Sequence, residues 1–304
     1  MIIETPENLE YSLNKMIIET PDKFRIKMPF NYPPINETTF EEYFYKKILE
    51  NKDITDRVYL PIFWANVYVS RNYHQSDISD IQFFLDKLDR KIKYYTIVQY
   101  DDNIVNDLKD LDILIFAMNG YGKYKDKCYP IPLNCLPPSN IEIKEKDIFA
   151  SFIGTIKNPD DSPRHPIRYD MIDAISDKKE YLIIETNGFK PELYNEFIDI
   201  MSRTVFSLSP RGYGLSSFRI CEALQFESIP VFIYDIPFIP FYTEYNFEDI
   251  GVLIDPNNIK DIDSILRSIS KNRINEMIEN GRKIYNKFYD YDGCYDSIIR
   301  ILKR

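Results

Sequence analysis

The sequence predicts an α/β protein with two parallel β-sheets. Short β-rich runs alternate with segments of helical spacing in two series, from about residue 57 to 117 and from 148 to 254. A stretch rich in Gly, Pro and Tyr, residues 119–140, separates them. The chain has 304 residues, 44% of them hydrophobic, which suits two domains of ordinary size. Strands that alternate with helices indicate parallel sheets.

Apolar runs predict the strands of the first series. Residues 58–64 form a short buried strand or the exit from one, and residues 94–99 and 112–117 form two more strands. Between them, residues 78–88 place their apolar side chains at helical spacing. The Gly- and Pro-rich stretch that follows should be a loop.

The second series predicts a five-stranded layer. The expected strands are 148–154, 181–185, 205–209, 229–233 and 252–254. The expected helices are 168–175, 192–202 and 216–225, with helical segments from 259 to the end.

A repeated hexapeptide marks the start of the chain, because Met-Ile-Ile-Glu-Thr-Pro occurs at residues 1–6 and again at 16–21. Six residues are too few for a solenoid unit, so we expect residues 1–20 to be a peripheral segment. The remaining expected parts are an N-terminal domain, a C-terminal domain and a C-terminal helix, over residues 21–140, 141–285 and 286–304.

Composition excludes several classes of function. The net charge of -10 argues against binding to nucleic acid, which needs clustered Lys and Arg. Four cysteines and two histidines have no short paired spacing, so we expect no metal site. Three Asp-x-Asp matches, at 110–112, 261–263 and 290–292, are attributed to chance in so acidic a chain. No run of ~18 apolar residues and no secretory signal is visible, so a soluble, cytoplasmic protein is expected.

Residues 207–224 carry the strongest chemical signal, a β-rich run followed by Pro-Arg-Gly-Tyr-Gly and a helix start. Gly212 and Gly214 permit positive φ and close approach of a ligand. Ser216 and Ser217 can cap the helix and leave its N–H groups aimed at an anion.

Charged residues complete this pattern. Arg211 and Arg219 suit bidentate phosphate contacts, and Glu222 lies where a carboxylate can accept the hydroxyls of a ribose. Gly-x-Gly turns are also common outside ligand sites. The segment is neither a Walker motif nor a dinucleotide fingerprint, which disfavours a dehydrogenase. The pattern predicts a cradle for a ribose diphosphate.

Residues 206–225, followed by Ile-Pro-Val-Phe at 229–232 and Pro-Phe at 237–238, resemble the core of the exostosin family of glycosyltransferases. The resemblance implies a GT-B fold, with two Rossmann-like domains facing a central cleft, and a UDP-sugar held mainly by the C-terminal domain. This chain departs from the family at residues 225–228, where relatives usually have a small residue and Gly. The donor-binding residues expected are Gly154, Arg168, Arg211, Gly212, Tyr213, Gly214, Ser216, Ser217, Arg219, Glu222 and Asp235.

The acceptor side is less clear. Asp101 and Asp102 close a predicted strand at its carboxyl end, where α/β sheets place ligands, and either could be the base that takes the acceptor proton. A turn-forming Asp pair is the alternative. The further acceptor-side candidates are Trp64, whose ring could stack on a sugar or pack in the core, and His74 and Asp77.

These features predict an inverting glycosyltransferase that needs neither a metal nor a cofactor. It would move sugar from a UDP-sugar to a hydroxyl of a glycan or glycoconjugate. The alternative is a catalytically idle GT-B module that binds glycan or a partner glycosyltransferase.

Overall fold

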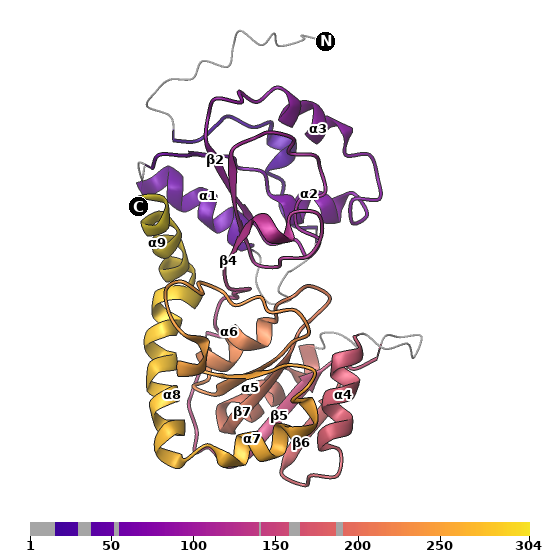
Figure 1. The fold of residues 1–304 in the computed structure, drawn as a ribbon, viewed down its shortest axis with the longest axis vertical. Coiled ribbons are helices and arrows are strands. Elements are labelled where there is room, and N and C mark those ends of the chain that lie inside the picture. The colour runs from indigo at the N-terminus through magenta and orange to yellow at the C-terminus, as the bar shows by residue number, and fades with distance from the viewer. Residues whose placement is uncertain (1–15, 30–37, 52–54, 140, 158–164, 187–190) are drawn as a thin grey trace. The chain divides into compact units, whose positions relative to one another are not determined.

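The computed structural model describes residues 16–29, 38–51, 55–139, 141–157, 165–186 and 191–304. The chain divides into two compact units. The N-terminal unit comprises Met1–Tyr129 and Tyr295–Arg304, and the C-terminal unit comprises Pro130–Cys294. The sequence analysis placed this division at residue 140. Each unit contains a parallel sheet flanked by helices, which confirms the α/β class (Figure 1).

The first sheet has the order β1-β2-β3-β4, and its first three strands are parallel. Its strands are β1 (Val58–Tyr59), β2 (Tyr94–Val98), β3 (Ile113–Ala117) and β4 (Cys128–Pro130). Every residue of β2 is buried, as expected for a strand covered on both faces. The three strands predicted here are confirmed, although β1 covers only Val58–Tyr59 and Trp64 begins a helix. β4 lies in the stretch predicted to be loop.

The helices of this region are η2 (Asp22–Phe24), α1 (Phe40–Asn51), α2 (Trp64–Ser70), α3 (Ser79–Asp86), η3 (Lys125–Lys127) and α9 (Tyr291–Leu302). α3 confirms the predicted helix, whereas α1 and α2 were not predicted. In α1, Phe40, Phe44 and Ile48 recur every fourth residue and are buried, which is the signal of an amphipathic helix. The ring of Tyr295 on α9 packs against Phe44 with centroids 4.9 Å apart.

The expectation that residues 1–20 are peripheral is wrong for residues 16–20. Ile17 forms a parallel bridge with Tyr59 of β1. The Ile18 N–H donates to the Tyr59 carbonyl at 3.0 Å, and the Tyr59 N–H donates to the Met16 carbonyl at 2.8 Å. Ile18 and Thr20 are buried. β1 lies at the edge of its sheet, and the second hexapeptide copy satisfies backbone groups there. The first copy lies outside the described residues.

The second sheet is parallel, with the order β6-β5-β7-β8-β9. Its strands are β5 (Ile148–Gly154), β6 (Tyr181–Glu185), β7 (Thr204–Pro210), β8 (Ile229–Ile233) and β9 (Val252–Ile254), each within one residue of its prediction. The chain passes from β6 back across β5 to β7. Strand order therefore reverses at β5 and β7, a point where open α/β sheets bind ligands beyond the carboxyl ends of their strands.

Helices cover both faces of this sheet. They are α4 (Pro166–Ile175), η4 (Pro191–Leu193), α5 (Tyr194–Arg203), α6 (Phe218–Gln225), η5 (Phe247–Asp249), η6 (Ile259–Asp261), α7 (Ile262–Ser268), α8 (Lys271–Ile284) and the π-helix η7 (Tyr285–Tyr289). Phe206 and Leu208 of β7 share a core with residues of α4 and α7. Ser207 points to the other face and contacts Met201 of α5, which packs with Ala223 of α6.

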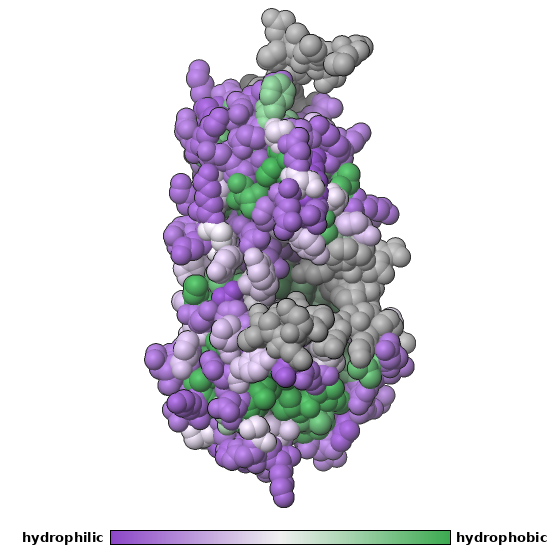
Figure 2. All heavy atoms as spheres, turned by 90° about the vertical axis from the view of Figure 1, so that its right-hand side faces the viewer, coloured by the Kyte–Doolittle hydropathy of each residue, from purple (hydrophilic) through white to green (hydrophobic). Residues whose placement is uncertain are grey.

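On the face shown in Figure 2, hydrophilic side chains predominate among the described residues, with smaller hydrophobic patches among them. Within the described parts of the chain, no helix has the length and apolar character needed to cross a membrane.

Candidate functional site

Three predicted donor residues meet at the carboxyl edge of the second sheet. Gly154 ends β5, Arg211 directly follows β7, and Asp235 lies two residues after β8. Because β5, β7 and β8 are neighbours in the sheet, these residues gather at one edge. This edge includes the point where strand order reverses, which is the position expected for a ligand site.

Arg211 is almost completely buried, with 2% of its surface exposed. Its Nε donates to the carbonyl oxygens of Gly212 at 3.3 Å and Gly214 at 3.1 Å, and its Nη2 donates to the Tyr213 carbonyl at 2.6 Å. Its Nη1 lies 2.7 Å from Asp235 Oδ1. The guanidinium thus binds the loop that follows β7, residues 211–217, from inside; we call this segment the β7 loop.

Asp235 is the counter-ion of this arginine. Partial burial opposes ionisation of the Asp235 carboxyl, but the hydrogen bond and charge of Arg211 outweigh it and hold the pKa below its usual value. His165 Nε2 lies 3.5 Å from the second oxygen, Oδ2. The carboxylate therefore lies between two basic side chains.

His165 is the N-cap of α4, and its Nδ1 accepts the N–H of Ile167 at 3.3 Å. This leaves the proton on Nε2, toward Asp235. Burial, followed by the charge of Arg211, lowers the pKa of the imidazole. The sequence analysis did not include His165 among the site residues, although its place before Pro166 at the first helical position marks a helix start.

Arg168 joins α4 to the ends of two strands. Its Nε donates to the Arg211 carbonyl at 3.1 Å, and its Nη1 donates to the Thr155 carbonyl at 2.5 Å. The predicted residue therefore lies at the carboxyl edge, where its guanidinium binds backbone oxygens that follow β5 and β7.

The conformation of the β7 loop differs from the expectation. Gly122 is the only described glycine with a positive φ, so neither Gly212 nor Gly214 adopts one. The Gly212 N–H instead donates to the Ser216 carbonyl at 3.0 Å and closes the loop. A Cβ added at Gly212 would meet the Ser216 oxygen at 3.7 Å, an ordinary contact. The described chain therefore leaves room above Gly212.

The predicted capping of α6 is also wrong in its detail. Ser217 occupies the N-cap position, but its side chain makes no capping hydrogen bond. Ser216 is buried, whereas Tyr213 has 59% of its surface exposed. Ser217 therefore does not supply the side-chain acceptor that a capping serine provides.

Arg219 and Glu222 lie together on α6. Arg219 Nη2 donates to the Ile153 carbonyl at 2.6 Å, and its Nε lies 3.2 Å from Glu222 Oε2. The guanidinium also stacks over the Phe197 ring, 4.7 Å from its centroid. The Glu222 side chain keeps 27% of its surface exposed, so its carboxylate is accessible from solvent.

Asp101 and Asp102 follow β2 in the N-terminal unit. Asp101 Oδ1 accepts a hydrogen bond from the Asn119 amide at 2.6 Å. Gly122 lies directly against Asp102, because a Cβ there would come within 2.3 Å of the Asp102 carbonyl oxygen. The loop after β3 therefore positions the loop after β2, and Asn119 is a contact that the sequence analysis did not identify.

His74 ends a left-handed turn of three residues that are not glycine. Asn72, Tyr73 and His74 have φ values of 50°, 54° and 58°, a conformation that costs roughly 1–2 kcal/mol for each such residue. His74 Nδ1 lies 2.8 Å from the Tyr100 hydroxyl. This turn brings the imidazole to the end of β2.

The other two acceptor-side candidates have structural contacts. Asp77 accepts the Ser79 N–H at 2.8 Å at the start of α3, and this bond lowers its pKa. Trp64 is fully buried and donates its indole N–H to Thr96 Oγ1 at 2.9 Å. The stacking role considered for Trp64 is therefore wrong in this structure, because the ring has no face open to a sugar.

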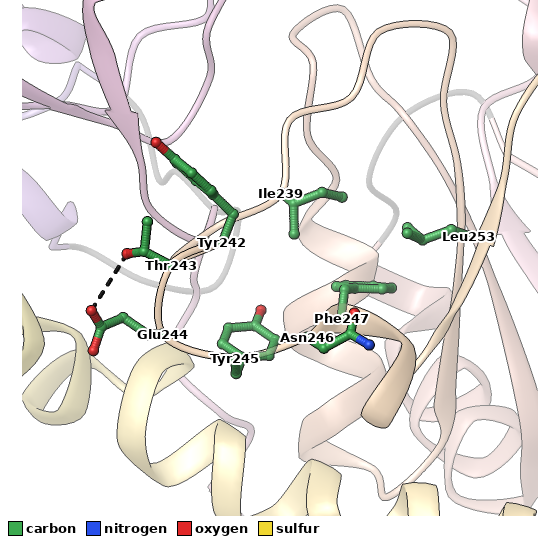
Figure 3. A pocket seen from close by; sticks show the side chains of 8 residues that line it. All are labelled: Ile239, Tyr242, Thr243, Glu244, Tyr245, Asn246, Phe247 and Leu253. Atoms are coloured by element: carbon green, nitrogen blue, oxygen red, sulfur yellow. Dashed lines mark hydrogen bonds between the residues drawn. The ribbon is translucent and has the colours of Figure 1, made fainter.

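A pocket of about 420 Å³ lies along the segment after β8, in the C-terminal unit. Figure 3 shows its lining: Ile239, Tyr242, Thr243, Glu244, Tyr245, Asn246, Phe247 and Leu253. Phe241, with φ of 48°, is buried, whereas Tyr242 beside it is 59% exposed. The volume is within the range of small-molecule sites. None of these described lining residues was predicted as a site residue.

Two of the acidic side chains in the Asp-x-Asp matches form ion pairs with arginines. Asp112 binds Arg57 at 2.7 Å, and Asp263 binds Arg267 at 2.9 Å. Among the residues that the structure describes, no group of three or more His, Cys, Asp or Glu side chains is placed to hold a metal ion.

Known proteins resemble parts of this chain. An exostosin-1 homolog from Caenorhabditis elegans is 28% identical over 108 residues, 35% of this chain and 28% of that protein. A probable β-1,4-xylosyltransferase from Arabidopsis thaliana is 40% identical over 73 residues, 24% of this chain and 18% of that protein. Each match thus spans less than a third of the relative's own length.

Solved structures are similar at lower identity. The crystal structure of Anabaena HepE in complex with UDP aligns over 84% of this chain and 81% of that chain, with 11% identity and a TM-score of 0.46. A family model for the exostosin GT47 domain matches residues 114–269, just over half of the chain. The matched residues contain β5 to β9 and the β7 loop. The chain therefore belongs to the exostosin GT47 family.

Proposed function

We propose that this chain is a glycosyltransferase that moves a sugar from a UDP-sugar to a hydroxyl of a glycan or glycoconjugate. The observation that carries the proposal is the gathering of the β7 loop, α6 and Asp235 at the carboxyl edge of β5, β7 and β8, inside the region matched by the family model. Relatives named as glycosyltransferases support the class of reaction.

The donor is bound by the C-terminal unit, as in the GT-B fold that the family resemblance implies. Peptide N–H groups of the β7 loop and the N-terminus of α6 face the diphosphate. Arg219 adds positive charge, and Glu222 accepts the ribose hydroxyls. These groups would stabilise the leaving UDP with fixed dipoles and charge, so the reaction requires no metal ion.

The acceptor reacts in a single displacement. Its hydroxyl oxygen attacks the anomeric carbon of the donor, and UDP leaves with the electrons of the broken bond. Asp101 or Asp102 takes the hydroxyl proton. The Asn119 amide, 2.6 Å from Asp101 Oδ1, holds that carboxylate in a fixed orientation. One displacement inverts the anomeric configuration.

The test is to incubate the purified chain with a panel of nucleotide sugars, with and without glycan acceptors. UDP release and the mass of the product are measured. We expect one or a few UDP-sugars to be consumed, and consumption to rise with an acceptor. Binding of a UDP-sugar without release or transfer would favour the idle module. If no nucleoside diphosphate or nucleotide sugar binds, the proposal fails.

A further inference from the structure

Three consecutive carbonyl groups of the β7 loop converge on one buried guanidinium. The carbonyl oxygens of Gly212, Tyr213 and Gly214 all accept from Arg211, at 3.3, 2.6 and 3.1 Å. In a trans peptide, the carbonyl and the next N–H point in opposite directions. The N–H groups of residues 213–215 therefore point away from the guanidinium. Peptide N–H groups that point out of a loop can donate hydrogen bonds to an anion bound beside it.

From this arrangement we infer that Arg211 is a positioning residue of the donor site rather than a ligand of the diphosphate. It draws the loop carbonyls inward and so presents the loop N–H groups to the phosphates. The inference rests on the proposed function, since the anion is taken to be the diphosphate of the donor. The backbone N–H groups of the loop and the Arg219 guanidinium then make the contacts with the diphosphate.

Asp235 helps to hold the Arg211 guanidinium in this position. A buried guanidinium is costly without a counter-charge, and Asp235 Oδ1 lies 2.7 Å from Arg211 Nη1. His165 Nε2 approaches the other carboxylate oxygen at 3.5 Å. Arg168 Nε binds the Arg211 carbonyl, so the residue is fixed at its backbone as well as its side chain. Asp235 thus positions Arg211, which positions the loop.

The direction in which Asp235→Asn changes the affinity for UDP distinguishes the two possible roles of Arg211. If Arg211 bound the diphosphate directly, Asp235 would compete for it, and Asp235→Asn would leave UDP binding unchanged or strengthen it. If Arg211 positions the loop, removal of the Asp235 carboxylate leaves the guanidinium without its counter-ion. The loop N–H groups then lose their fixed orientation. UDP binding then weakens, although the site has gained net positive charge.

The experiment compares UDP and uridine affinities in the full chain. We expect Asp235→Asn to weaken UDP binding about tenfold or more, because small misplacements in a preorganised site have effects of this order. Uridine affinity should change less than twofold, since uridine has no phosphate. Asp235→Glu, which keeps the carboxylate, should restore part of the UDP affinity. Arg211→Lys keeps the charge but not the three carbonyl contacts, and should weaken UDP binding as much as Arg211→Ala.

A matched control lies at the opposite ends of the same strands. Arg203 and Asp147 form a two-bond ion pair, at 2.8 and 2.6 Å, just before β7 and β5. Asp147→Asn and Arg203→Lys should leave both affinities unchanged. If the control variants lost as much UDP affinity as Asp235→Asn, the loss of any ion pair in this unit would have the same effect, and the inference would be overturned.

Hydrogen exchange of the unmodified chain gives an answer even if a variant does not fold. UDP should slow amide exchange in residues 213–215, whereas uridine should not. Absence of this protection overturns the inference. Equal or tighter UDP binding by a folded Asp235→Asn also overturns it, while the proposed function stands. Failure of the unmodified chain to bind UDP or another nucleoside diphosphate refutes the proposed function instead.

Discussion

Glu227 and Arg282 form a two-bond ion pair at the second residue after α6, where the backbone is left-handed. Arg282 Nε donates to Oε1 at 2.7 Å and Nη2 donates to Oε2 at 2.5 Å. Glu227 has a φ of 54°, a conformation in which glycine is favoured after a helix. This is the segment in which the sequence departs from the family pattern, and the ion pair compensates in part for the missing glycine. The hydrogen bond from Arg282 is the main cause that holds the pKa of the Glu227 carboxyl below its usual value.

Replacing Glu227 separates the backbone strain from the ion pair. Glu227→Ala keeps the strain and loses the pair, so it should lower the free energy of unfolding by about 0.5–1 kcal/mol, the range for a pair with an exposed partner. Glu227→Gly also relieves the strain and should be about 1 kcal/mol more stable than Glu227→Ala. Denaturant unfolding of both variants measures the difference. Equal stabilities would contradict the strain assigned to Glu227.

Glu41 is a fully buried carboxyl in the N-terminal unit. Its oxygens accept the N–H groups of Gln99 at 2.8 Å and Ala65 at 3.1 Å. Burial raises its pKa from the usual 4.5 to about 8, and these two hydrogen bonds only partly oppose the shift. Ala65 lies in the first turn of α2, so Glu41 satisfies a helix N–H from another part of the chain.

Glu41 should make stability depend on pH. Between pH 4.5 and about 8 the folded chain keeps the Glu41 proton, whereas the unfolded chain loses it. The free energy of unfolding should therefore fall as pH rises through this window, by about 1.4 kcal/mol per pH unit at most. Glu41→Gln should remove this contribution, even if the amide lowers stability at every pH. Parallel pH profiles for the parent and Glu41→Gln would rule out a neutral buried carboxyl.

Glu222 is expected to recognise the ribose of the donor. In the parent, 2'-deoxy-UDP should bind more weakly than UDP, because the carboxylate loses one hydroxyl partner. A hydrogen bond to a charged group contributes about 1.5–3 kcal/mol. Glu222→Gln should discriminate less between the two nucleotides, as measured by calorimetry. If the parent and the variant lose equal affinity on removal of the 2'-hydroxyl, Glu222 serves only to pair with Arg219.

Asp101 and Asp102 are the proposed bases. Asp101→Asn or Asp102→Asn should lower turnover by roughly 10²–10⁴-fold while UDP affinity stays unchanged. Asp126→Asn, in η3 of the same unit, is a control that should retain turnover. The measurement is the initial rate of UDP release with acceptor present. Full activity in both variants would show that neither aspartate is the base. His74, which the left-handed turn holds against Tyr100, would then be the next candidate.

Metal independence and inversion are tested together. Turnover should survive excess EDTA, because the positive charge at the diphosphate comes from Arg219 and backbone dipoles. NMR of the first product formed should show the opposite anomeric configuration to the donor. Loss of activity in EDTA with recovery in Mn²⁺ would reject the metal-free proposal, and a retained anomer would reject the single displacement.

Several features of this protein could be predicted from the sequence because they are local. Most strands are short apolar runs, and these runs place β2, β3 and β5 to β9 within one residue, whereas β4 was missed and β1 is shorter than expected. The family resemblance placed Gly154, Arg211 and Asp235 in one donor site, and the parallel sheet brings the carboxyl ends of β5, β7 and β8 to one edge. α1 carried an equally clear signal, Phe40, Phe44 and Ile48, that the sequence analysis did not use.

Tertiary structure decided what each side chain contacts. Arg211 meets Asp235 because β7 and β8 pair, and the Trp64 indole N–H has its acceptor in Thr96 on β2. Glu227, which is left-handed after α6, pairs with Arg282 from α8. Each of these partners is distant in the chain. Residue type fixes what a guanidinium or an indole can bind, whereas the packing of strands and helices determines which partner is within reach.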